Sequence, residues 1–224
     1  MKKLKVKFTT TDPMLGMTPS TPELYTKFLE ITVKKLGVRA AALTSEKTEE
    51  ELKALRLDRD ETTQENRGFT VYPRDANGNP IFWDYQIRGF LKDSFRALLQ
   101  TSDKDWSKAS KCPLNNYNVA KRVDQILFVE PRQIVINVPE GTEITFCERP
   151  IRKPSARNSE VEESAIGKSE QIEAGATFEV TFVILNDDYV PFIKKACEYA
   201  KFRGFGQWRN SGKGRAICEF IEES

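Results

Sequence analysis

The sequence contains no histidine, and this absence removes several kinds of catalytic chemistry. Ser-His-Asp and Cys-His nucleophilic machinery, histidine general bases and histidine-ligated zinc are all excluded. The four cysteines are at least 21 residues apart, so no CxxC pair exists for zinc, iron–sulfur or thioredoxin-like redox chemistry. We expect reduced thiols in a core, with no metal and no cofactor.

Long apolar runs are also absent. No stretch approaches the roughly 18 to 20 apolar residues that cross a bilayer, and Met1-Lys2-Lys3 leads into an alternating segment rather than a signal peptide. A cytoplasmic protein without a membrane partner is expected. The net charge is only +2, from 35 Lys and Arg against 33 Asp and Glu, so an anionic partner must be met by a local patch.

Hydrophobic spacing predicts an α+β protein. We expect strands over 3–10, 125–130, 133–138, 142–148, 177–185 and 216–221, a hairpin over 69–83 with an exposed Asn77-Gly78 tip, and helices over 22–36, 48–57, 84–100 and from 187 to about 200. Residues 101–122 are polar and loop-like. This order predicts a ferredoxin-like (RRM-like) antiparallel sheet with inserted helices, in a single domain over 1–224 with insertions at about 38–67 and 149–175.

The helix expected over 84–100 has two distinct faces. Its apolar residues recur at helical spacing and predict a face buried in the core. Arg88, Lys92 and Arg96 form a basic row at i, i+4 and i+8 beside that face. The helix is therefore expected to offer an anion-facing edge.

The segment from Arg149 to Gly175 lacks apolar periodicity, and a connection of that length is usually functional or disordered. Its first third carries Arg149, Arg152, Lys153 and Arg157 and no acidic residue until Glu160. A solvated charge run is the alternative explanation.

A glycine-rich loop, residues 204–215, precedes the last expected strand. Four of the twelve glycines lie in it, and Lys201 to Arg215 holds five basic residues and no acidic one. Glycines let a backbone approach a ligand, Lys and Arg neutralise phosphates, and Phe205 and Trp208 offer faces for bases to stack on. The spacing fits neither a Walker loop nor a dinucleotide loop. A tight αβ connection with solvated charges and a core-packed Trp208 is the alternative.

The loop reads Gly204-Phe205-Gly206-Gln207-Trp208-Arg209-Asn210-Ser211-Gly212-Lys213-Gly214-Arg215, and it resembles the GxGxxRxxGxGR loop of the RAMP superfamily, whose members build CRISPR effector complexes. The segment from Ile87 to Arg96 is similar to that family's Ile-Pro-Gly-Ser-Ser-Leu-Lys-Gly helix start in its Ile, Gly, Leu, Lys and Arg, and departs from it at the Pro, the Ser-Ser and the second Gly. Ile172 to Phe178 looks like the turn before the family's penultimate strand. The resemblance covers residues 81–98 and 171–221 well and the remainder poorly.

The resemblance implies a backbone subunit that polymerises along a guide RNA, grips phosphates and inserts a thumb between base-paired stretches in antiviral defence. Its partners would be single-stranded guide RNA, further copies of the chain and other CRISPR-type subunits. The segment from Arg149 to Arg157 would be the thumb, and Arg209 and Arg215 would either bind RNA or support the loop. The RNA-binding residues implied in this way are Arg88, Lys92, Arg96, Arg152, Lys153, Arg157, Gly204, Gly206, Trp208, Arg209, Gly212, Lys213, Gly214 and Arg215.

Two further functions stay open. One is a stand-alone or mobile-element relative that assembles with protein partners or interferes with such complexes. The other is a metal-dependent endoribonuclease using a carboxylate, for which Asp58, Asp60 and Asp75 lie in the general region where target-cutting relatives carry an aspartate. None of the three sits in a matching motif, and exposed carboxylates are usually solvated charge. RNA binding without a catalytic residue is therefore preferred.

Overall fold

The computed structural model describes residues 1–20, 69–101, 118–152 and 164–223, and the chain forms two compact units. Unit 1 comprises Met1–Met14, Ile81–Thr142 and Ile172–Ser224, and unit 2 comprises Leu15–Pro80 and Glu143–Gln171. The helices expected over 22–36 and 48–57 and the insertion at 38–67 lie outside the described residues. The single domain over 1–224 stays a prediction.

Unit 1 is built on a four-stranded antiparallel sheet in the order β11-β1-β10-β6. Its strands are β1 (Lys2–Thr10), β6 (Leu127–Glu130), β10 (Thr177–Ile184) and β11 (Ala216–Glu223). Helix α3 (Asp84–Leu99) lies between β1 and β6 along the chain, and α5 (Val190–Glu198) lies between β10 and β11. This βαββαβ order with the last strand beside the first is ferredoxin-like, as the sequence predicts.

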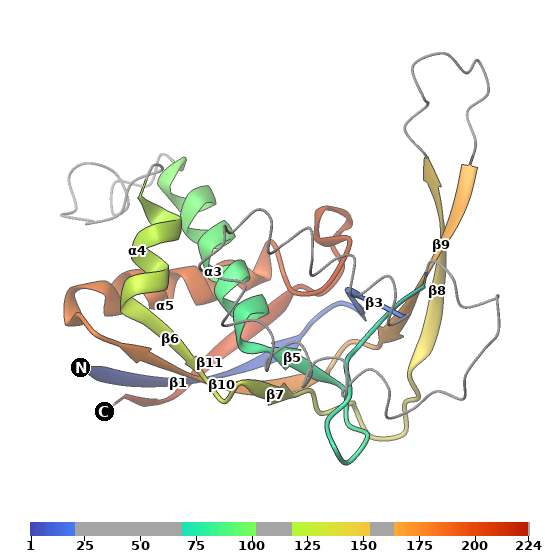
Figure 1. The fold of residues 1–224 in the computed structure, drawn as a ribbon, viewed down its shortest axis with the longest axis horizontal. Coiled ribbons are helices and arrows are strands. Elements are labelled where there is room, and N and C mark those ends of the chain that lie inside the picture. The colour runs from blue at the N-terminus through green and yellow to red at the C-terminus, as the bar shows by residue number, and fades with distance from the viewer. Residues whose placement is uncertain (21–68, 102–117, 153–163, 224) are drawn as a thin grey trace, which may run out of the picture. The chain divides into compact units, whose positions relative to one another are not determined.

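The core lies between this sheet and the helices on one of its faces (Figure 1). Leu4, Val6 and Phe8 alternate along β1 and are fully buried. Phe8 stands opposite Phe178 of β10 with ring centroids 5.2 Å apart. The period of two along β1 therefore puts one complete set of side chains into the core.

Helix α3 contributes the opposite layer of that core. Ile87, Leu91 and Phe95 are buried, as the helical spacing predicts, and Phe90 is buried beside them. Leu98, which the same spacing places on this face, is only partly buried. The first turn is closed by the side chain of Gln86, which accepts a 2.9 Å hydrogen bond from the backbone N–H of Trp83. Helix α5 follows a short 3₁₀ turn, η2 (Asp187–Tyr189), and a second 3₁₀ turn, η3 (Tyr199–Lys201), continues it.

One helix of unit 1 is not expected from the sequence. Helix α4 (Val119–Ile126) occupies part of the segment expected to be a loop and the first two residues of a predicted strand. It buries Val119 and Val123 and leads directly into β6. The predicted strand start at Gln125 is therefore wrong, and the strand begins at Leu127.

Unit 2 holds most of a mixed sheet in the order β2-β9-β4-β3, in which β8 also pairs with β9. Its strands are β2 (Met14–Leu15), β3 (Thr18–Pro19), β4 (Phe69–Val71), β8 (Thr145–Arg152) and β9 (Ser164–Ile172). A largely buried ion pair connects the segment after β4 to β9: Arg74 Nη2 lies 3.0 Å from Glu170 Oε1. The backbone N–H of Tyr72 also donates to Glu170 Oε2 at 2.7 Å.

The structure changes two predictions about these segments. The hairpin over 69–83 is present only near its tip: the exposed Asn77-Gly78 turn has Gly78 at φ +82°, and Arg74 and Pro80 form an antiparallel bridge. Farther from the tip, β4 pairs with β3 and β9, and β5 (Ile81–Trp83) pairs with β7 (Gln133–Val135). The segment 149–175, expected to be an insertion without regular structure, contains the end of β8, all of β9 and the start of the turn to β10. In both segments the structure depends on pairing with strands that are distant in the sequence, and local hydrophobic spacing carries no information about such pairing.

Among the described residues, no helix is both long enough and apolar enough to cross a membrane.

Candidate nucleic-acid interface

The glycine-rich loop, residues 204–215, runs from η3 back to β11 within unit 1 and begins by turning inward. Phe205 is only 3% exposed and packs against Phe90, Phe8 and Phe178, with ring centroids at 4.3, 5.0 and 4.9 Å. The expectation that Phe205 offers a stacking face is therefore wrong, because it is a core residue that anchors the loop to α3 and the sheet.

Two glycines close the loop on itself. A Cβ at Gly204 would lie 1.5 Å from the carbonyl oxygen of Gly214, and a Cβ at Gly214 would lie 2.0 Å from the carbonyl oxygen of Phe205. The backbone N–H of Phe205 also donates to the Gly214 oxygen at 2.9 Å. The two ends of the loop are thus in backbone contact, and glycine is required there for the loop's own closure.

The middle of the loop presents Trp208 on a tight turn. Trp208 has φ +56°, in the left-handed region that bulky residues rarely adopt, and its side chain is 38% exposed. The 3₁₀ turn η4 (Arg209–Ser211) follows, with the N–H of Ser211 donating to the Trp208 oxygen at 2.9 Å. Gly206 and Gly212 flank this turn with φ +78° and +80°. The alternative of a core-packed Trp208 does not fit this exposure.

Two arginines of the loop are held by acidic residues outside it. Arg209 Nη2 lies 3.0 Å from Asp93 Oδ2 on α3. Arg215 makes a bidentate contact with Asp12, its Nε and Nη2 each donating at 2.9 Å to one carboxylate oxygen. The hydrogen bond from Arg215 is the main reason why the pKa of Asp12 is lowered. Both arginines therefore connect the loop to acidic residues outside it.

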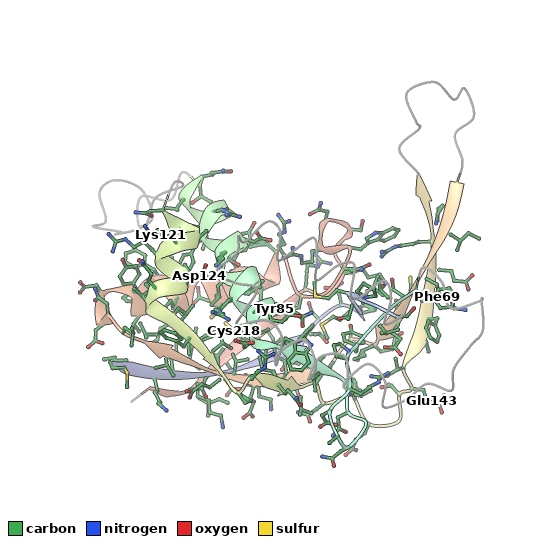
Figure 2. The ribbon with its side chains drawn as sticks, in the orientation of Figure 1. Phe69, Tyr85, Lys121, Asp124, Glu143 and Cys218 are labelled. Carbon is green, nitrogen blue, oxygen red and sulfur yellow. The ribbon has the colours of Figure 1, made fainter. Side chains whose placement is uncertain are left out.

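The basic row on α3 is also paired with acidic side chains. Arg88 Nη2 lies 2.9 Å from Asp84, and Lys92 contacts Asp124 of α4, which Figure 2 labels. Arg96 is the most exposed of the three, with a side chain 51% accessible and a looser 3.8 Å approach to Asp93. The row is therefore partly neutralised within unit 1, and Arg96 keeps the most accessible charge.

The basic segment expected to be a thumb belongs to unit 2. Arg149 is 8% exposed on β8, and burial lowers its pKa. Arg152 is the last residue of β8, and Lys153 and Arg157 lie outside the described residues. Strands β8 and β9 pair with each other and expose Phe146 and Ile166, at 50% and 73%.

Of the three carboxylates considered for RNA cleavage, Asp75 is the one within the described residues. Asp75 caps the exposed turn: its Oδ1 accepts hydrogen bonds from the backbone N–H groups of Asn77 and Asn79, at 2.9 and 2.8 Å. Burial acts to raise the pKa of Asp75, but a 3.0 Å hydrogen bond from the Asn79 side-chain amide and the two backbone bonds outweigh it, so the pKa is lowered. Asp58 and Asp60 lie outside the described residues. No cluster of three or more Cys, Asp or Glu that could hold a metal occurs in the described part of the chain.

The structure adds two residues to the candidate interface that sequence patterns did not indicate. Asp12 and Asp93 each hold a loop arginine, and they come from the segment after β1 and from α3. Asp12 belongs to no motif, and Asp93 lies within the Ile87 to Arg96 segment but at none of its matching positions. Each is far along the chain from its partner. The one signal in the sequence is negative: the loop has three basic residues and no acidic one, so its counter-charges had to come from elsewhere.

The sequence matches no known protein family and no curated protein. The structure does match solved structures. Over 100% of its length it matches a chain from "Cryo-EM structure of the Type III-B Cmr-beta bound to cognate target RNA", with a TM-score of 0.51 and 11% identity. The chain spans 60% of the length of that Type III-B chain. At this identity the similarity shows a shared fold.

Two further solved structures align over nearly the whole of this chain with lower TM-scores. A chain of the "Type IV-B CRISPR Complex" aligns over 98% of this chain and 90% of its own length, with 11% identity and a TM-score of 0.45. Cmr6 from Pyrococcus furiosus aligns over 98% of both chains, with 11% identity and a TM-score of 0.42. The resemblance seen in the sequence is thus confirmed at the level of fold by the Type III-B match.

Proposed function

We propose that this chain is an RNA-binding backbone subunit of a CRISPR-type ribonucleoprotein, which oligomerises along a guide RNA through phosphate contacts. The observation that carries the proposal is the glycine-rich loop itself. It stands immediately before the last strand of a ferredoxin-like sheet, it is closed by backbone contact between its ends, and it exposes Trp208 among basic residues. A fixed turn with an exposed aromatic ring and neighbouring cations suits a single strand, whose bases stack and whose phosphates are neutralised.

The fold similarity supports the same proposal. The matched Type III-B chain comes from a complex solved with cognate target RNA bound. A shared fold alone assigns no function, so the weight rests on the loop and on the basic row of α3. Arg96, Trp208 and Lys213 are the residues to which we assign the most direct RNA contact.

Salt-dependent binding tests the proposal. Fluorescence anisotropy with a labelled, unstructured single-stranded RNA should give an affinity that falls steeply with salt and varies little with sequence. The charge reversal Arg96→Glu should weaken binding and reduce the salt slope by about 0.7 per lost phosphate contact. Lys121→Glu on α4 is the matched control, because it removes one cation outside the loop and the row. Binding that does not respond to salt or to Arg96→Glu would reject the proposed contact.

One specific observation favours a second candidate function. Four of the basic residues assigned to RNA binding are already paired with carboxylates at hydrogen-bonding distance: Arg88, Lys92, Arg209 and Arg215. Such pairing lowers the net positive potential that RNA would meet and favours a relative that assembles with protein partners. Titration with the same RNA at low salt separates the two, because a protein-binding relative gives no anisotropy change.

A further inference from the structure

Asp12 and Asp93 hold the glycine-rich loop from two sides. Asp93 lies on α3 and accepts a hydrogen bond from Arg209 at 3.0 Å. Asp12 follows β1 and accepts two hydrogen bonds of 2.9 Å from Arg215. We propose that both aspartates are positioning residues for RNA binding, and that Arg209 and Arg215 act by fixing the loop rather than by touching the strand. This inference rests on the proposed function.

The two contacts lie at the places where the loop needs support. Backbone hydrogen bonds already fasten its far end, because the N–H of Thr11 donates to the Arg215 oxygen at 2.7 Å and that of Gly214 to the Pro13 oxygen at 2.9 Å. The Asp12 contact strengthens this end. The Asp93 contact holds Arg209, the residue directly after Trp208.

The turn at Trp208 has little intrinsic preference for its observed shape. A left-handed conformation at a non-glycine residue costs on the order of 1–2 kcal/mol and persists only where surrounding contacts impose it. The 3₁₀ turn that follows is three residues long, and such short turns are weakly stable by themselves. The Arg209–Asp93 ion pair is thus well placed to keep the indole in one orientation.

Removing the negative charge of Asp12 or Asp93 should change RNA affinity in opposite directions under the two roles of the arginines, fixing the loop or contacting RNA. If Arg209 and Arg215 bound phosphates directly, Asp12 and Asp93 would neutralise them, so Asn in place of either acid should strengthen RNA binding. If the acids position the loop, the same change frees its arginines and lets Trp208 move. Binding should then weaken although a negative charge has been removed.

The test uses the full chain and the labelled single-stranded RNA described above. We expect Asp93→Asn to raise the Kd about fivefold or more, up to the effect of Trp208→Ala. The double variant Asp93→Asn, Trp208→Ala should bind no more weakly than Trp208→Ala alone, because the aspartate acts through the indole. Asp124→Asn is the matched control: it releases Lys92 but touches nothing in the loop, and its Kd should stay the same or fall.

A charge swap tests the Asp12–Arg215 contact even if a single substitution disturbs folding. Asp12→Arg and Arg215→Asp should each weaken binding, and the double variant should restore it, since the contact is re-formed in reverse. Tighter binding by Asp93→Asn, or a double swap that stays defective while circular dichroism shows a native fold, would overturn the inference. Wild-type protein that binds no RNA would instead remove the proposed function on which it rests, so the two failures are distinguishable.

Discussion

Replacing Gly204 by alanine tests the closure of the glycine-rich loop. The new Cβ would lie 1.5 Å from the Gly214 oxygen, whereas ordinary contacts begin near 3.4 Å, so backbone must move by roughly 2 Å. Overpacking of this kind costs about 1–3 kcal/mol, and loss of the hydrogen bond from Phe205 to Gly214 adds about 1 kcal/mol. We expect Gly204→Ala to lower the free energy of unfolding by about 2–4 kcal/mol.

Two other glycines provide matched controls for this substitution. Gly89 is exposed within α3, and a Cβ there meets nothing within 4 Å, so Gly89→Ala should stabilise the protein by about 1 kcal/mol. Gly78 also has open space but a φ of +82°, so alanine there should cost about 1–2 kcal/mol through backbone strain alone. Equilibrium urea unfolding of the three variants ranks their free energies of unfolding. A Gly204→Ala variant no less stable than Gly78→Ala would refute the proposed closure.

Three further predictions concern the exposed ring, one carboxylate and one thiol. Trp208→Ala should weaken single-stranded RNA binding by about 1–3 kcal/mol, or about 5- to 150-fold in Kd by anisotropy, whereas Phe128→Ala, at an exposed ring on β6, should not. The pKa of Asp12 is lowered from its ordinary 3.8, so its contact with Arg215 adds stability above that value and loses it as pH falls through the lower folded pKa. Acid unfolding curves of the wild type and Asp12→Asn should therefore converge below pH 3.8, and curves that stay parallel would contradict this. Burial raises the pKa of Cys218 to about 11, so iodoacetamide at pH 8 should label it only slowly until urea unfolds the chain, and prompt labelling of the native protein would disprove this.

Much of unit 1 can be predicted from the sequence because its elements carry regular hydrophobic spacing. The alternation in β1 and the helical spacing in α3 each identify one buried face, and the order of elements then leads to a ferredoxin-like sheet. Helix α4 was missed because eight residues with two buried valines give too short a pattern. Strand β9 was missed because its residues, such as Lys168, Ser169 and Glu170, are mostly polar.

The sequence predicts which residues make up the candidate interface, but not which of their side chains are buried, exposed or paired. Phe205 and Trp208 are three residues apart and look equivalent in the sequence, yet one is buried in an aromatic cluster and the other is exposed. The difference comes from the closure of the loop at Gly204 and Gly214, which only the folded backbone defines. The same holds for Arg215, whose partner Asp12 is 203 positions away.

The nucleic-acid content of the protein, as purified from an expression host at low salt, tests the central proposal most directly. Absorbance ratio, mass by light scattering and sequencing of any extracted RNA would be measured on the same sample. We expect RNA of defined length bound to a multimeric particle, and loss of both in the Trp208→Ala, Arg96→Glu double variant. A nucleic-acid-free protein that also leaves labelled single-stranded RNA unbound at low salt would contradict the account and point to a protein partner.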